Sequence, residues 1–213
     1  MGMAAAMVLT ACAGGDDRGK ETEQSSAPGE VCGGLFAGDA GAALRTALGS
    51  GPFQPSVGGE SAGDAAGKLA AEPLDDDAWR EHRLCSVHKG SEAGIADLTV
   101  TGERVSPAIA DAPHTRPEVA RYAVGRGAWA DANRAVVYVD CVSSRLAGAD
   151  GSTPAVVAVS AWNRTFPQGD VAKYREANLT LAHAGAVAVV KELGCRDNAG
   201  LTDRPAVQEV PAG

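Results

Sequence analysis

The sequence predicts an α+β fold, a two-layer sandwich in which helices pack on one face of an antiparallel sheet. Three observations lead to this fold class. Helical periodicity comes first along the chain, β-rich segments follow, and a long helical pattern closes it. Strands and helices do not alternate, as they would in a parallel sheet. With 45% apolar and 22% charged residues, the 213-residue chain can bury one core.

The helices are predicted from apolar residues spaced three and four apart. The first such run ends at Gly49, and the last places Leu179, Val189 and Leu193 on one stripe. Prolines and glycines after the first run predict a loop. The expected helical elements are 34–48, a weaker piece over 63–71, a capped turn at 75–79 and a long helix over 169–193, with a loop over 49–60.

The strands are predicted from alternating apolar and polar residues. A turn over 131–134 suits a hairpin because it contains Asp131 and Asn133. Pro107, Pro113 and Pro117 mark a long loop before that hairpin. The expected strands are 83–88, 97–105, the hairpin strands 122–130 and 135–142, and 155–162.

The chain begins with an apolar run, 1–11, that is typical of an export signal. It is too short to span about 30 Å of hydrocarbon, which takes roughly 20 helical residues. No basic residue precedes it, so we expect the true translation start to lie upstream.

The run ends in Leu9-Thr10-Ala11-Cys12, which resembles the lipobox of bacterial lipoproteins. That resemblance implies that Cys12 is diacylated and becomes the mature N-terminus. Two acyl chains make a stable anchor, so Cys12 would hold the protein on the outer face of the cytoplasmic membrane. Residues 12–30 then form a polar tether with little to bury.

Taken together, the lipobox, the polar tether and the Ala-rich, Cys-bearing domain make the chain similar to secreted actinobacterial lipoproteins of uncharacterised function. This resemblance implies no catalytic residues. We expect a single domain over 31–196, followed by a frayed tail over 197–213.

Four cysteines remain once Cys12 is set aside, and an even number in an exported protein predicts disulfides. Three connectivities are open. We favour Cys32 with Cys85 and Cys141 with Cys195, because each pair joins a helix end to a strand in the same half of the chain. Zinc is the competing interpretation, but the usual C-x-x-C spacing is missing.

Neither the charge nor the metal-ligating residues indicate a cofactor or a nucleic-acid partner. The formal net charge is −8, with 27 acidic against 19 basic residues. Asp75, Asp76 and Asp77 lack the alternate spacing of a calcium loop. The four histidines, His82, His88, His114 and His183, lack the i, i+4 spacing of a helical metal site. His183, beside the apolar stripe of the last helix, is expected at the edge of the core.

Two short motifs suggest hydrolase chemistry but lack its context. Gly59-Glu60-Ser61-Ala62-Gly63 fits the nucleophile elbow of serine hydrolases, yet prolines occupy the position of the strand that should precede it. Ser61 is therefore expected to be a helix N-cap. Ser86-Val87-His88-Lys89 fits S-x-x-K, but in a strand Ser86 and Lys89 point to opposite faces.

We therefore expect a non-enzymatic, lipid-anchored envelope domain that binds a protein partner or a small ligand. The candidate binding residues are Arg126, Trp129, Trp162 and Arg164, because aromatic side chains with arginine are favoured at binding hot spots. The competing interpretation is that the tryptophans fill the layer between helices and sheet. An envelope serine hydrolase using Ser61 and a carrier of a small apolar ligand are the alternatives in function.

Overall fold

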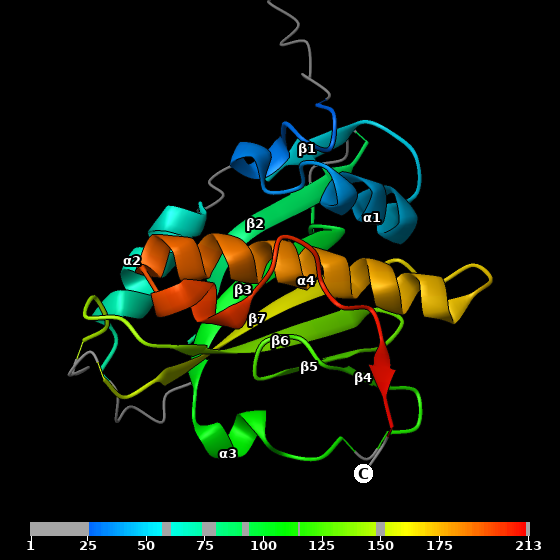
Figure 1. The fold of residues 1–213 in the computed structure, drawn as a ribbon. Helices are drawn as coiled ribbons and strands as arrows, with labels where there is room; N and C mark the ends of the chain where they lie inside the picture. Colours follow the sequence, from blue (N-terminus) through cyan, green and yellow to red (C-terminus); the bar gives the residue numbers. More distant parts are fainter. Residues whose placement is uncertain are drawn as a thin grey trace, which may run out of the picture.

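A computed structural model describes residues 26–56, 61–73, 80–90, 94–114, 116–147 and 152–211. Within these ranges eight strands form one antiparallel sheet in the order β1-β2-β3-β7-β6-β5-β4-β8 (Figure 1). The strands are β1 Phe53–Pro55, β2 His82–Lys89, β3 Leu98–Val105, β4 Ala120–Tyr122, β5 Gly127–Ala130, β6 Arg134–Cys141, β7 Ala155–Asn163 and β8 Glu209–Val210. The helices are α1 Asp39–Leu48, α2 Ala62–Ala71, α3 Pro107–Ala110 and α4 Val171–Leu193, with the short 3-10 turns η1 Val31–Gly34 and η2 Arg196–Gly200.

The main core lies between one face of the sheet and three helices, α1, α2 and α4. Side chains of β7 alternate: Val157, Val159 and Ala161 belong to this core, while Val156 and Ala158 belong to a smaller cluster. The smaller cluster also contacts Ala110 of α3, so α3 packs on the opposite face. In Figure 1 strands β5, β6 and β7 lie between α4 and α3. The predicted α+β sandwich is confirmed, with α3 as the one described helix outside its helical layer.

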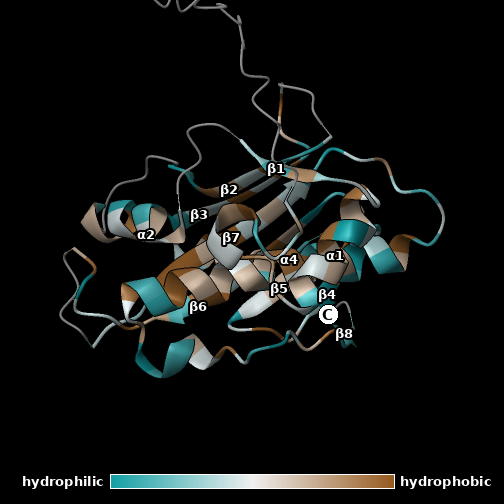
Figure 2. Cartoon of the chain, turned by 90° about the horizontal axis from the view of Figure 1, so that it is seen from above, coloured by the Kyte–Doolittle hydropathy of each residue, from teal (hydrophilic) through white to brown (hydrophobic). Residues whose placement is uncertain are grey.

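Helix α4 crosses the sheet and is the centre of the helical layer. The side chain of Asp170 caps its first turn, and Gly194 ends it in the left-handed conformation. Gly185 brings the helix close to the strands, because a Cβ there would lie 2.7 Å from Val100 Cγ1. Figure 2 shows mostly white to brown residues on the strands near α4 and more teal ones in the loops and on the helix surfaces.

Both predicted disulfides are present. Cys32 in η1 is joined to Cys85 in β2, which fixes the N-terminal segment to the sheet. Cys141 at the end of β6 is joined to Cys195, which directly follows the Gly194 cap of α4. Each bridge therefore joins a helical element to a strand within one half of the chain.

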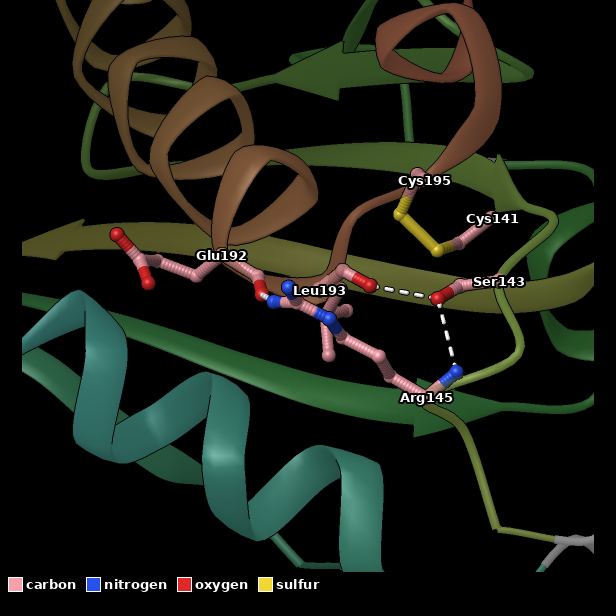
Figure 3. The surroundings of a disulfide bond; sticks show 6 residues. All are labelled: Cys141, Ser143, Arg145, Glu192, Leu193 and Cys195. Atoms are coloured by element: carbon pink, nitrogen blue, oxygen red, sulfur yellow. Dashed lines mark hydrogen bonds between the residues drawn. A yellow bond between two sulfur atoms is a disulfide. The ribbon is translucent and has the colours of Figure 1, made fainter.

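Polar groups next to the second disulfide donate hydrogen bonds to backbone carbonyls at the C-terminal end of α4 (Figure 3). The Ser143 hydroxyl donates to the Leu193 carbonyl at 2.6 Å, and the Arg145 guanidinium donates to the Glu192 carbonyl at 2.6 Å. Ser143 in turn accepts from the Arg145 amide at 3.1 Å. Since the last carbonyls of a helix have no partner within it, these bonds fix where α4 ends.

Several element boundaries differ from those predicted. The first helix begins at Asp39, because Gly38 has a positive φ of 59° and separates it from η1. The predicted loop over 49–60 contains β1. The predicted strand 122–130 is two strands, β4 and β5, paired with each other through a turn at Gly125, where φ is 57°.

The segment predicted as a frayed tail contains more structure than its composition suggested. It includes most of η2, a buried Leu201, and β8, which pairs with β4. The predicted turn at 75–79, the signal 1–11, Cys12 and the tether up to residue 25 lie outside the described residues.

Two buried asparagines connect the sheet to α4. Asn163 at the end of β7 donates to the Asn178 side chain of α4 at 2.5 Å, and Asn178 donates to the Asp131 carbonyl. Both asparagines are fully buried. The Asn133 amide extends the network to the carbonyl of Thr165 at 2.7 Å. Both N-x-[ST] tripeptides of the chain, 163–165 and 178–180, therefore place their asparagines in the interior.

Candidate functional site

The candidate site lies on the outer face of the sheet, which we define as the face turned away from α4. The pairing register places five side chains in adjoining rows on this face: Trp162 opposite Arg134 and Thr99, and Ser160 opposite Thr101. Their strands, β3, β7 and β6, are neighbours at the centre of the sheet. The arrangement combines an indole ring, a guanidinium and hydroxyl groups.

Arg134 connects the two described tryptophans. It pairs with Trp162 across β6 and β7, and its guanidinium carbon lies 5.8 Å from the centre of the Trp129 ring. Trp129 is buried, whereas the Trp162 side chain is 44% exposed. The two rings therefore differ in environment: the buried Trp129 ring packs near the Arg134 guanidinium, and the Trp162 ring is exposed to solvent.

A buried carboxyl faces the same region. Glu103 is 8% exposed on β3, two residues along from Thr101 on the same face. Burial, together with the nearby negative charge of Glu81, raises the pKa of Glu103 to about 7, and Arg134 partly offsets that rise. The Arg134 guanidinium also lies 4.0 Å from the Glu81 carboxylate.

Among the described residues, the site has one buried polar atom without a hydrogen-bond partner, Arg134 Nε. Thr101 and Ser160, by contrast, bond to each other at 2.9 Å. Buried polar groups in folded proteins are nearly always paired, so the unpaired Arg134 donor is one that a ligand could satisfy.

Part of the outer face is covered by residues 106–114 and 116–119. His114 packs on Trp129 with ring centres 4.5 Å apart, and burial lowers the pKa of His114. Arg116 forms an ion pair with Asp131 at 3.2 Å. These residues account for the burial of Trp129. Trp129 is therefore buried on the outer face and not in the layer between helices and sheet, where the competing interpretation placed the tryptophans.

The four predicted binding residues do not form one group. Arg126 forms ion pairs at 2.7 Å with Asp111 and with Asp140, near the other end of β6. Asp140 and Arg134 are six positions apart on that strand, which is about 20 Å. Arg126 is therefore separated from Trp162.

Arg164 is next to Trp162 in sequence but serves the strand end. Its amide donates to the Asp97 carbonyl at 2.9 Å, and its guanidinium to the Ile95 carbonyl at 3.4 Å. Arg134, Glu103 and Glu81 were not among the residues predicted from the sequence. Alternation along the strands could have placed Glu103 and Arg134 on one face, but only the sheet order brings them near each other.

The Ser61 motif forms a helix cap. Ser61 is exposed at the N-terminus of α2 and forms a reciprocal capping box with Asp64, whose amide donates to the Ser61 hydroxyl at 3.1 Å. The Ser61 amide and hydroxyl donate to the Asp64 carboxylate at 3.0 and 2.8 Å, and these two bonds lower the pKa of Asp64. A carboxylate of lowered pKa is a poor base for activating a serine.

A serine–histidine contact does occur elsewhere. The Ser56 hydroxyl lies 2.9 Å from His88 Nε2 at the edge of the sheet. Within the described part of the chain, no group orients the other nitrogen of His88, so the third member of a catalytic triad is missing there. Ser86, the serine of S-x-x-K, is buried on β2, whereas Lys89 is exposed.

The remaining titratable groups do not assemble into a metal centre. No cluster of three or more His, Cys, Asp or Glu side chains that could hold a metal occurs among the described residues. His183 is buried on α4, and burial lowers its pKa. His82 instead contacts Glu72 at 2.6 Å.

In the ranges that the structure describes, no helix has the length and apolar character needed to cross a membrane.

Comparison with protein-family models, with curated proteins and with solved structures finds no match for this chain.

Proposed function

We propose that the protein is a lipid-anchored cell-envelope lipoprotein whose domain binds a partner or ligand through its outer face. Its lipidated residue is Cys12, and the domain stands outside the cytoplasmic membrane. The observation that carries the binding role is the placement of Trp162, Arg134 and Glu103 on one sheet face, with the buried Arg134 Nε left unpaired.

The chemistry of this face favours a polar ligand that also has a flat apolar part. The exposed Trp162 ring can stack on such a part, because indole buries a large area with little loss of rotamer freedom. Arg134 needs a hydrogen-bond acceptor, and a protonated or ionised Glu103 can respectively donate or accept. A chain of sugar residues and a polar peptide both offer this combination.

The anchoring part of the proposal depends on the sequence and on the two disulfides. Disulfides persist in oxidising compartments outside the cytoplasm, which agrees with export. The four described cysteines pair with one another in these bridges. A cysteine at the end of an apolar run, as Cys12 is in the sequence, is what lipid attachment requires.

The two alternative functions gain less support. A hydrolase using Ser61 would need a free hydroxyl beside a base, whereas Ser61 caps α2. A carrier of a small apolar ligand would need a cavity lined by apolar side chains. A hollow of about 260 Å³ lies between α1 and α4, but Asp39, Lys173 and Glu176 are among the residues lining it.

The test is a binding comparison with cell-envelope extract separated into protein and glycan fractions. The full chain carrying Cys12→Ser is immobilised as the parent protein, and Trp162→Ala and Arg134→Gln are added to it separately. Lys191→Ala, on the exposed side of α4, is the matched control. We expect one fraction to bind the parent and the control, and binding to fall at least about tenfold in both outer-face variants.

Equal binding by all four proteins would overturn the assignment of the site. The alternatives are tested on the same material. Labelling by a fluorophosphonate that disappears in Ser61→Ala would establish the hydrolase instead, and lipid copurifying with the chain would establish the carrier.

A further inference from the structure

The exposed large apolar side chains are concentrated at one end of the sheet. Six such side chains occur among the described residues. Four of them lie just before β3, at the end of β7, in the connection after β7, or at the first residue of α4. These four are Ile95, Trp162, Phe166 and Val171. Ile95 and Phe166 are the most exposed, at 72% and 78%, so this end presents apolar surface to its surroundings.

Hydrogen bonds hold these segments in place. Arg164 binds the carbonyls of Asp97 and Ile95, which joins the segment after β7 to the segment before β3. The Asn133 amide donates to the Thr165 carbonyl at 2.7 Å, and the Tyr174 hydroxyl accepts from the Gln168 amide at 3.1 Å. Apolar side chains are therefore displayed on anchored backbone. We call Ile95, Phe166 and Val171 the apolar edge.

The N-terminal segment enters the domain at the same end. Ser26, the first described residue, pairs with Phe53 of β1, and Phe53 pairs with Lys89 of β2. Further across the sheet, Leu98 at the start of β3 pairs with Asn163 at the end of β7. Ser26 and Asn163 are thus about four strand spacings apart, or roughly 20 Å.

We propose that the apolar edge rests on the lipid surface of the membrane to which Cys12 is attached. This inference rests on the proposed lipid anchor. Cys12 precedes Ser26 by fourteen positions, so the two residues stay within roughly 50 Å of each other even at full extension. The anchor therefore favours contact of the near end of the sheet with lipid. Aromatic and aliphatic side chains beside an arginine, here Arg164, are the composition that enters the headgroup region.

The chain provides a matched control at the other end of the sheet. Ile109 of α3 is also exposed, at 54%. It follows the end of β3 at Val105, whereas Ile95 precedes the start of that strand. The proposal predicts lipid contact at Phe166 but not at Ile109.

The experiment attaches the full chain to vesicles through the thiol of Cys12. The vesicles contain phosphatidylglycerol, a maleimide-bearing lipid, and phosphatidylcholine brominated near the headgroup end of its acyl chains. Tryptophan reporters are introduced as Phe166→Trp or Ile109→Trp in a Trp162→Phe parent. Bromine quenches indole fluorescence only at short range, and the signal of the parent protein is subtracted.

We expect brominated lipid to remove about half or more of the added fluorescence at Phe166→Trp and almost none at Ile109→Trp. Equal quenching at the two positions, or none at Phe166→Trp, would overturn the proposal. The second result is also the one expected if the edge binds a protein. The chemical attachment replaces lipidation in the cell. A lack of quenching at Phe166→Trp therefore tests the membrane contact alone, and it does not depend on whether Cys12 is lipidated in the cell.

Discussion

Arg134 and Trp162 face each other across β6 and β7, and the same guanidinium lies 5.8 Å from the centre of the buried Trp129 ring. One arginine thus joins an interior ring to an exposed one. On the outer face, we therefore expect the buried Trp129 ring to contribute to stability and the exposed Trp162 ring to contribute to binding.

Truncating the two rings should therefore have different effects. Trp129→Ala should lower the free energy of unfolding by about 3–5 kcal/mol, because it removes a buried ring from the cluster around Tyr138. Trp162→Ala should cost less than about 1 kcal/mol, since its ring is nearly half exposed. Urea unfolding of both variants measures the difference. Equal losses would mean that Trp162 is part of the core.

Glu103 should make stability depend on pH. Its pKa is about 7 in the folded protein and near the ordinary value of 4.5 when unfolded. The folded state therefore keeps its proton as pH rises, while the unfolded state releases it. Stability should fall between about pH 4.5 and 7, by up to roughly 3 kcal/mol, and stay low above that range.

Glu103→Gln should remove this fall, because a neutral side chain of similar shape does not titrate. The comparison is urea unfolding of wild type and variant at pH 5 and at pH 8. A stability difference between the two proteins that is the same at both pH values would contradict the assignment of this carboxyl.

Two helical glycines should respond in opposite ways to alanine. At Gly185 a Cβ would lie 2.7 Å from Val100 and 3.0 Å from Val159, so Gly185→Ala should cost about 1–3 kcal/mol. Gly67 in α2 is exposed and has no atom within 4 Å of an added Cβ. Gly67→Ala should therefore stabilise by up to about 1 kcal/mol through helix propensity. Thermal unfolding of the two variants tests the close approach of α4 to the sheet.

Removing the second disulfide should destabilise the fold. The bridge between Cys141 and Cys195 spans 54 positions, and closing a loop of that length contributes about 4 kcal/mol in the chain-entropy description. The double variant Cys141→Ser with Cys195→Ser should lose about that amount in urea unfolding. Peptide mapping without reduction provides the direct check, and a peptide joining Cys85 to Cys141 would contradict the pairing.

Local patterns in the sequence were enough to predict most of the architecture. The stripe of Leu179, Val189 and Leu193 predicted α4 because helical spacing puts these side chains on one side. The disulfide pairs could be predicted because each joins elements within one half of the chain. The split between β4 and β5 was missed, since the turn at Gly125 is set by one glycine inside an otherwise β-rich run.

The candidate site was less accessible from the sequence, for a physical reason. Trp162 could be singled out as an aromatic residue at a strand end, but Arg134 was assigned to a turn. What places Arg134 against Trp162 is the pairing of β6 with β7. Likewise, Glu103 of β3 and Arg134 of β6 interact electrostatically only because a single strand, β7, separates β3 from β6 in the sheet. Strand order depends on contacts between distant segments, which local periodicity does not encode.

Cys12 is the residue that we propose holds the domain at the membrane. The direct measurement is the distribution of the protein between membrane and medium when the wild type and Cys12→Ser are expressed with the complete export signal. The wild type should stay with the membrane and carry a diacylglycerol on Cys12 by mass spectrometry. Cys12→Ser should be released into the medium or accumulate with its signal uncleaved. Membrane retention of a processed Cys12→Ser protein, at the level of the wild type, would contradict the account.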